Sequence, residues 1–256
     1  MAETIFMIHG MFGAPWYWEN YRRKFEAEGY RCIVTTLRYH DMDPRGVPHP
    51  LLGTTSLLDY AEQLEKEICQ LDETPIVMGH SMGGLLAQIL GARKRAKALV
   101  LLTPASPAGI MALTPSVIKT FWSVQTKWGF WNSPFRLKFS EVVYSMLHLF
   151  PEKEQWEIYN KFVYESGRSA TQIGYWFFDP SQASSVDESR VICPVLVIAG
   201  TLDRITPASV ARKIALKYKT VSTYKDFENH AHWVVGEPGW QEVADYVSSW
   251  LVKHHM

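Results

Sequence analysis

The chain has 256 residues, enough for one large domain or two modest ones with a sizeable buried core. Hydrophobic residues make up 47% of the chain and charged residues 20%, as in an ordinary globular protein. The 26 Lys and Arg residues balance the 26 Asp and Glu residues, which argues against a nucleic-acid partner and against a basic membrane-surface protein.

The start of the chain, "MAETIFMIHG", differs from a signal peptide because it lacks a basic segment and its apolar run is short. No run approaches the roughly 18 apolar residues of a membrane-spanning helix. Cys32, Cys69 and Cys193 lack C-x-x-C spacing, which favours reduced thiols in a reducing compartment. We therefore expect a soluble, cytoplasmic monomer or homodimer without a membrane span.

Six short apolar runs alternate with amphipathic stretches along the chain. The first, third, fourth and fifth runs are almost continuously apolar, which is typical of strands covered on both faces of a parallel sheet. The runs cover residues 4–10, 31–38, 74–80, 98–104, 194–200 and 221–227, and the helical patterns cover 15–28, 55–72, 82–94, 208–217 and 239–252. This alternation predicts an α/β fold with a mostly parallel six-stranded sheet and helices on both faces. If the first strand lies beside the third, the strand order is 2-1-3-4-5-6.

Residues 105–190 interrupt this alternation. They contain no convincing core strand but hold 17 of the 34 aromatic residues. We interpret them as an inserted helical cap over one end of a core formed by residues 1–104 and 191–256. Most of the aromatic side chains pack the insertion, and the remainder are expected to line an apolar pocket. The pocket candidates are Phe12, Trp128, Phe130, Trp131, Trp176, Phe177 and His230.

The strongest motif is "GHSMG", which places Gly79, Ser81 and Gly83 in a G-x-S-x-G pattern. It follows a buried-strand run and precedes a helical pattern, as a nucleophile elbow must. The glycines leave room for the strand and the helix to approach, and the sharp turn exposes the serine hydroxyl. The helix start aims the backbone N–H of Met82 at an anion forming near Ser81. We predict that Ser81 is a nucleophile.

A second motif, "HGMFG", follows the first strand at His9. In the predicted strand order, the first and third strands lie side by side where the order of connections reverses, and ligands bind at such a switch point. The loop is therefore expected to supply a second oxyanion donor, the backbone N–H of Met11. We interpret His9 as a residue that orders the loop.

Asp203 lies three residues after the fifth strand, in "GTLDRITP", where a carboxylate can orient a catalytic histidine. The loop after the fourth strand, "TPASPAG", offers no competing carboxylate. Thr206 and Pro207 are read as the N-cap and first residue of the next helix.

Two histidines follow the sixth strand in "DFENHAHWVVGEP". His230 and His232 could form a metal-binding H-x-H, but zinc needs a third and usually a fourth ligand, and the available candidates have better roles. We expect no metal and no cofactor. One histidine is expected to act as a general base, and the residues alone leave the choice between them open.

These four motifs resemble those of the α/β-hydrolase superfamily, in its serine esterase-like branch. In that superfamily the nucleophile, acid and histidine follow one another along the chain, as Ser81, Asp203 and the histidine pair do here. The resemblance also chooses the base, because the family histidine is often followed by an aromatic residue and, about five positions on, by Glu near Pro. His232 fits this frame with Glu237, although Ala231 stands where the family often has Gly or Asp. Residues 4–32 are also similar to the start of plant methylesterases and hydroxynitrile lyases.

The expected activity is hydrolysis of a carboxylic ester-like bond in a small, largely apolar substrate, through an acyl-enzyme on Ser81. A lactonase, thioesterase, carbon–carbon bond hydrolase, perhydrolase or hydroxynitrile lyase uses the same three residue types. The lyase also needs a charged group near its substrate, for which Lys127 and Lys138 are the candidates. A hydrolase-fold ligand receptor is the alternative from another functional class, and an incomplete set of catalytic residues would favour it.

Overall fold

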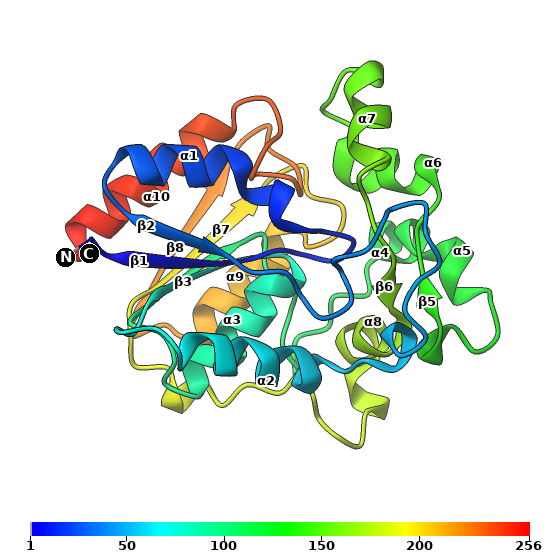
Figure 1. The fold of residues 1–256 in the computed structure, drawn as a ribbon, viewed down its shortest axis with the longest axis horizontal. Coiled ribbons are helices and arrows are strands. Elements are labelled where there is room, and N and C mark those ends of the chain that lie inside the picture. Colours follow the sequence, from blue (N-terminus) through cyan, green and yellow to red (C-terminus); the bar gives the residue numbers. More distant parts are fainter. Residues whose placement is uncertain (1) are drawn as a thin grey trace.

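The computed structural model describes residues 2–256 and contains a six-stranded sheet flanked by helices (Figure 1). The sheet order is β2-β1-β3-β4-β7-β8, and every neighbouring pair is parallel. The strands are β1 (Thr4–Ile8), β2 (Arg31–Val34), β3 (Ile76–His80), β4 (Ala98–Leu102), β7 (Val195–Gly200) and β8 (Ser222–Phe227). The predicted fold class and strand order are confirmed.

The helices cover both faces of the sheet. Phe6 and Ile8 of β1 point to a core shared with α2, α3 and α9, whereas Ile5 and Met7 point to a core shared with α1 and α10. This alternation explains why the central strands read as continuous apolar runs, since both faces are buried. The flanking helices are α1 (Glu19–Ala27), α2 (Leu57–Ile68), α3 (Met82–Ala92), α9 (Ala208–Lys217) and α10 (Trp240–Lys253).

A side-chain cap marks the start of α2, whereas the start of α9 has none. At α2, the Ser56 hydroxyl accepts a hydrogen bond from the Asp59 N–H, and the Asp59 carboxylate accepts one from the Ser56 N–H, which forms a capping box. At α9, the predicted N-cap is wrong by one residue. Pro207 occupies the N-cap position, and the Thr206 side chain bonds elsewhere.

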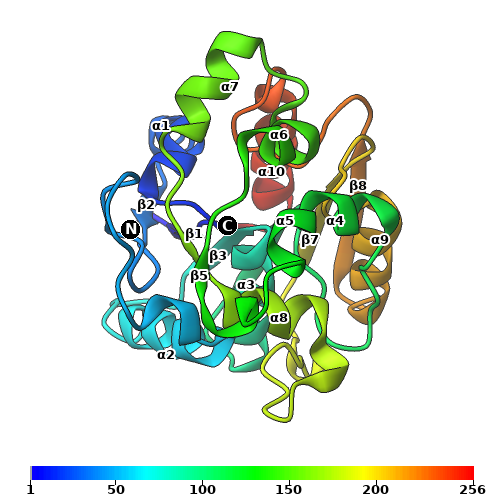
Figure 2. The ribbon, with the colours of Figure 1, turned by 90° about the vertical axis from the view of Figure 1, so that its right-hand side faces the viewer.

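The cap segment, residues 105–190 between β4 and β7, lies beyond the carboxyl ends of the strands (Figures 1 and 2). It adds no strand to the core sheet, as predicted. Its helices are α4 (Pro115–Thr120), α5 (Trp122–Gln125), α6 (Phe139–Val142), α7 (Glu152–Tyr159) and α8 (Gly167–Gly174). The short strands β5 (Pro134–Phe135) and β6 (Glu165–Ser166) pair with each other in an antiparallel sheet.

Short turns of other helix types complete the secondary structure. The 3₁₀ turns cover Pro15–Trp18, Leu52–Thr54, Phe130–Asn132, Trp176–Phe178 and Glu188–Arg190, and Val143–Leu147 forms a π-helical turn. None of the helices in residues 2–256 is long and apolar enough to cross a membrane.

Candidate active site

Ser81 occupies a sharp turn between β3 and α3. Its φ of +55° and ψ of −119° place a residue with a side chain in a region that normally favours glycine. The backbone is held on both sides, because the Ser81 N–H donates to the Leu102 carbonyl at 3.0 Å and the Ser81 carbonyl accepts from the Ala105 N–H at 2.9 Å. The strained conformation is therefore imposed by β4 and the loop that follows it.

The glycines of the motif are required by space. A Cβ at Gly79 would overlap the carbonyl of Gly83, and a Cβ at Gly83 would overlap the carbonyl of Ile8. The helix therefore approaches β1 and β3 more closely than any other residue type allows. The glycine spacing of the motif therefore has the predicted cause, which is the close approach of the strand and the helix.

The loop after β1 packs directly against this elbow. A Cβ at Gly10 would lie 2.9 Å from the Ser81 Cβ, so the loop backbone touches the serine side chain. Met11 and Met82 both line a cavity together with Ser81. Met82 is the first residue of α3, so its N–H has no acceptor within the helix. Within residues 2–256, the Met11 N–H also makes no hydrogen bond. Both predicted oxyanion donors are thus free to bind a ligand atom.

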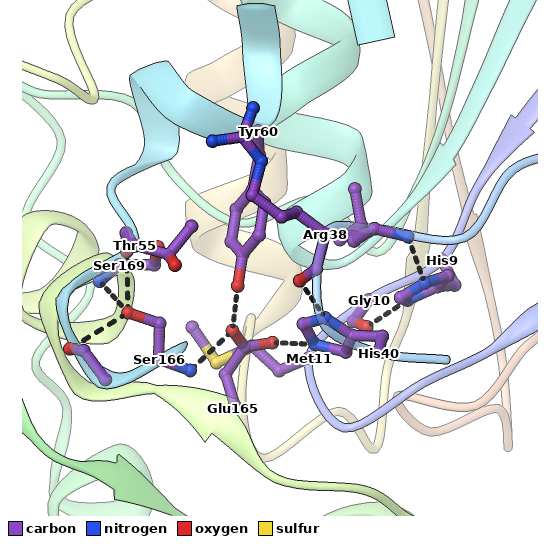
Figure 3. Close-up of polar contacts among 12 residues, drawn as sticks. His9, Gly10, Met11, Arg38, His40, Thr55, Tyr60, Glu165, Ser166 and Ser169 are labelled. Carbon is purple, nitrogen blue, oxygen red and sulfur yellow. Dashed lines mark hydrogen bonds and ion pairs between the residues drawn. The ribbon is translucent and has the colours of Figure 1, made fainter. Parts of the chain in front are cut away.

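His9 fixes the orientation of that loop (Figure 3). Its Nε2 accepts a hydrogen bond from the Leu37 N–H at 3.1 Å, so the proton is on Nδ1, which donates to the Gly10 carbonyl at 2.8 Å. Burial, with a smaller contribution from the nearby His40, lowers the pKa of His9 to about 3. A neutral ring with both nitrogens engaged orders the loop, as predicted, and is not a free base.

Asp203 and His232 meet at the carboxyl ends of β7 and β8. The His232 Nδ1–H donates to Asp203 Oδ2 at 2.8 Å, and the other oxygen, Oδ1, accepts from the N–H groups of Ile205 at 2.7 Å and Thr206 at 2.9 Å. Burial alone would raise the pKa of Asp203, but the adjacent His232 and these hydrogen bonds hold it below its usual value. The carboxylate is ionised and directs the imidazole.

With Nδ1 bonded to Asp203, Nε2 is the His232 nitrogen that remains available for proton transfer. Ser81 and His232 line one small cavity beneath the cap, next to Phe12. In the described part of the chain, Ser81 Oγ and His232 Nε2 do not yet form a hydrogen bond. The shared cavity is therefore what relates the two side chains.

Thr206 belongs to this cluster, although the sequence reading assigned it to a helix cap. Its Oγ1 lies 2.8 Å from Asp203 Oδ2, 2.9 Å from the Thr103 carbonyl and 3.3 Å from His232 Nδ1. The signal was present in "DRIT", since an aspartate followed three residues later by threonine is a common local hydrogen-bonding pattern. Thr206 therefore contacts both the carboxylate of Asp203 and the ring of His232.

His230 has a different partner from His232. Its Nδ1 lies 2.9 Å from Oε1 of the buried Glu237, which also accepts a hydrogen bond from the Ala231 N–H at 2.8 Å. His230 therefore orders the loop and lies outside both cavities that contain Ser81. Among residues 2–256, no group of three His, Cys, Asp or Glu residues could hold a metal ion.

Comparison with known proteins identifies the family of the chain. The family model described as "Alpha/beta hydrolase family" matches residues 5–246. The chain belongs to the alpha/beta hydrolase family. No curated protein matches the chain significantly.

Several solved structures share the fold of this alpha/beta hydrolase. A monoacylglycerol lipase from Paleococcus ferrophilus is 22% identical, with a TM-score of 0.70, and the alignment covers 98% of this chain and 94% of the lipase. A methylesterase from Arabidopsis is 12% identical, with a TM-score of 0.72 and coverage of 98% and 99%. A pyrethroid hydrolase from Sphingobium faniae is 16% identical, with a TM-score of 0.71 and 97% coverage of both chains.

The larger cavity of this alpha/beta hydrolase extends from Ser81 into the cap segment. About 750 Å³ of empty space, open solvent at its mouth included, lies between its lining residues. Its cap lining is mostly apolar and comes from α4, α5, α8 and the loops beside them. These lining residues are Ala112, Leu113, Val117, Phe121, Val124, Gln125, Phe130, Phe135, Ala170, Ile173, Gly174 and Tyr175.

The predicted pocket residues divide into two groups. Phe130 lines the larger cavity and Phe12 the smaller one. The other candidates, Trp128, Trp131, Trp176, Phe177 and His230, line neither cavity. Trp128 is 94% exposed and Phe177 45% exposed, because the turns that carry them face outward from the cap. Aliphatic residues of α4, α5 and α8 line the cavity where three tryptophans were predicted, together with Phe121, Phe135 and Tyr175.

Proposed function

We propose that this protein is a serine hydrolase that cleaves a carboxylic ester-like bond in a small, largely apolar substrate. The observation that carries the proposal is the arrangement around one cavity. Ser81 is held in a strained turn at its floor, and His232, whose Nδ1 is 2.8 Å from the buried Asp203 carboxylate, lines the same space.

The proposed reaction runs in two halves. As Ser81 Oγ attacks the carbonyl carbon, its proton passes to His232 Nε2, and Asp203 stabilises the imidazolium. The backbone N–H groups of Met11 and Met82 bind the oxyanion. His232 then protonates the leaving alcohol, and the acyl group stays on Ser81. Water repeats the sequence, giving its proton to His232 and releasing the acid.

The larger cavity, which extends from Ser81 into the cap segment, supports the choice of substrate class. None of its described lining residues carries a formal charge, so binding rests on apolar area with few polar contacts. The similar structures are described as a monoacylglycerol lipase, a methylesterase and a pyrethroid hydrolase, names that fit ester substrates. The proposal includes no cofactor, and it retains the expectation of a cytoplasmic monomer or homodimer.

The same geometry leaves lactones, thioesters and carbon–carbon bonds as substrate alternatives. The hydroxynitrile lyase loses support, because Lys127 and Lys138 are exposed and lie outside the cavity lining. The ligand receptor loses support because Ser81 and His232 line one cavity and His232 is hydrogen-bonded to Asp203.

The test combines labelling and turnover. A fluorophosphonate probe should label the wild-type protein on Ser81 and leave a Ser81→Ala variant unlabelled. Hydrolysis of p-nitrophenyl acetate by that variant should fall by a factor of roughly 10³ or more. A panel of esters, lactones and thioesters of varied chain length then ranks the substrate classes. Near-normal turnover by Ser81→Ala refutes the mechanism, and folded wild-type protein that resists the probe favours the receptor.

A further inference from the structure

A fully buried carboxylate, Glu165, lies where the cap segment meets the core (Figure 3). Its Oε1 accepts hydrogen bonds from the Tyr60 hydroxyl at 2.9 Å and from the Ser166 N–H at 2.7 Å, and its Oε2 lies 3.1 Å from Nε2 of His40. Carboxylates are almost never fully buried unless they are paired. The proposed reaction gives this group no task.

His40 is the charged partner. Its Nδ1 lies 3.1 Å from the Arg38 carbonyl, which can only accept, so Nδ1 carries a proton, while Nε2 faces the Glu165 carboxylate. Burial would lower the pKa of His40, but the charge of Glu165 and the hydrogen bonds raise it above its ordinary value. Tyr60 and the neutral His9 are the other titratable rings packed on it. Both ring nitrogens of His40 therefore face oxygen acceptors, the arrangement that suits an imidazolium beside a carboxylate.

The pair is part of a seam between the cap segment and the core. The hydroxyls of Ser166 and Ser169 both donate to the Thr55 carbonyl, at 2.6 Å and 2.8 Å. Two residues before Glu165, the Val163 N–H donates to the Phe12 carbonyl at 3.1 Å. The strand that carries Glu165 thus reaches the start of α2 on one side and the loop after β1 on the other.

That loop is held from both flanks of Met11. On one side, the ring of His40 packs against His9 at 5.2 Å between centroids, and His9 fixes the Gly10 carbonyl. The Gly10 carbonyl and the Met11 N–H belong to one planar peptide, so fixing one orients the other. On the other side, Phe12 has a φ of +63°, a conformation that a bulky residue keeps only when its surroundings impose it.

We propose that Glu165 and His40 are positioning residues, which clamp the loop after β1 between cap and core and so aim the Met11 N–H at the oxyanion. The inference rests on the proposed function, because it concerns the same oxyanion. A buried ion pair adds little net stability compared with apolar packing, whereas its fixed geometry serves orientation. A network in which every buried donor and acceptor is satisfied is also rigid.

The test separates positioning from folding. Glu165→Ala removes the acceptor for Tyr60, the Ser166 N–H and His40, and it should lower kcat for p-nitrophenyl acetate about tenfold, less than the 10² to 10³ expected for loss of an oxyanion donor. KM should change less than threefold. The Ki of a trifluoromethyl ketone, which mimics the tetrahedral intermediate, should rise in proportion to the fall in kcat/KM.

Two further variants control the result. Glu165→Gln can accept the same two hydrogen bonds and offer its amide to a neutral His40, so it should recover kcat to within about threefold of wild type. Ser169→Ala loosens the same seam away from the loop, so it should lower the melting temperature and leave kcat unchanged. If Glu165→Ala does not fold, Glu165→Asp, whose shorter side chain cannot reach both His40 and Tyr60, replaces it with the same expected fall in kcat.

The outcomes distinguish the two proposals. A folded Glu165→Ala or Glu165→Asp variant with wild-type kcat and wild-type Ki overturns the positioning role, provided that the wild-type protein labels with fluorophosphonate. An equal fall in kcat in Ser169→Ala also overturns it, because general loosening of the cap would then suffice. Wild-type protein that neither labels nor hydrolyses esters overturns the proposed function itself.

Discussion

Replacing Asp203 by asparagine is the sharpest perturbation of the proposed mechanism. Oδ1 of Asp203 accepts two backbone N–H groups, from Ile205 and Thr206, so this position must remain an oxygen in the variant. The new NH₂ group then takes the place of Oδ2, 2.8 Å from Nδ1 of His232. An amide donor cannot face an N–H, so Nδ1 loses its proton and Nε2 gains one.

The wrong tautomer leaves no base for Ser81. The equivalent substitution in a serine protease lowers kcat by about 10⁴, and we expect a fall of similar size here. That factor corresponds to about 5.5 kcal/mol of barrier. Folding should be nearly unaffected, because Thr206 Oγ1 can accept from the new amide while donating to the Thr103 carbonyl.

Steady-state kinetics on p-nitrophenyl acetate and the fluorophosphonate labelling rate measure the effect, with melting temperature as the control for folding. A variant within tenfold of wild type would show that His232 does not depend on Asp203 for its tautomer. The assignment of the acid would then be wrong.

Three other predictions follow from named contacts. His232→Ala should abolish ester turnover, whereas His230→Ala should keep most of it and lower the melting temperature; the reverse pattern in kinetics would exchange their roles. Gly10→Ala should reduce kcat at least tenfold, because the added Cβ would lie 2.9 Å from the Cβ of the elbow serine; unchanged kinetics would argue against close packing there. Because the pKa of His40 is raised in the folded protein, its ion pair with Glu165 contributes its full stabilising free energy below the unfolded-state pKa of about 6.5. This contribution is lost as the pH rises through the folded-state pKa. Urea unfolding should therefore show that any stability advantage of wild type over Glu165→Gln shrinks at alkaline pH, and a gap that widens with pH contradicts the charged pair.

The architecture was largely predictable because its signals are local. Continuous apolar runs such as 74–80 and 98–104 can only be strands buried on both faces or helical segments, and their shortness decides between the two. The G-x-S-x-G turn ties one strand to one helix through steric crowding at Gly79 and Gly83, which acts over five residues. Placement of Met11, Ser81, Asp203 and the histidine loop followed from each lying at the carboxyl end of a parallel strand.

The cap lining could not be predicted in the same way. Aromatic content suggested a pocket, but whether a ring faces inward depends on how the short helices of the cap segment lie on the core. Trp128 and Phe130 are two residues apart, yet one is exposed and the other lines the cavity. No periodic pattern distinguishes them, because the turn that holds them is neither a regular helix nor a strand.

The sequence by itself determined the alternation of buried strands and helices, the elbow at Ser81 and the order of the candidate catalytic residues, because these depend on residue patterns within short segments and on their order along the chain. Only the tertiary structure decided what lies beside them. Thr206 joins Asp203, and Glu165 from the cap meets His40, 125 residues away in the chain. Such pairs depend on the docking of distant segments, and a buried charge finds its partner only when the whole fold has brought the two together.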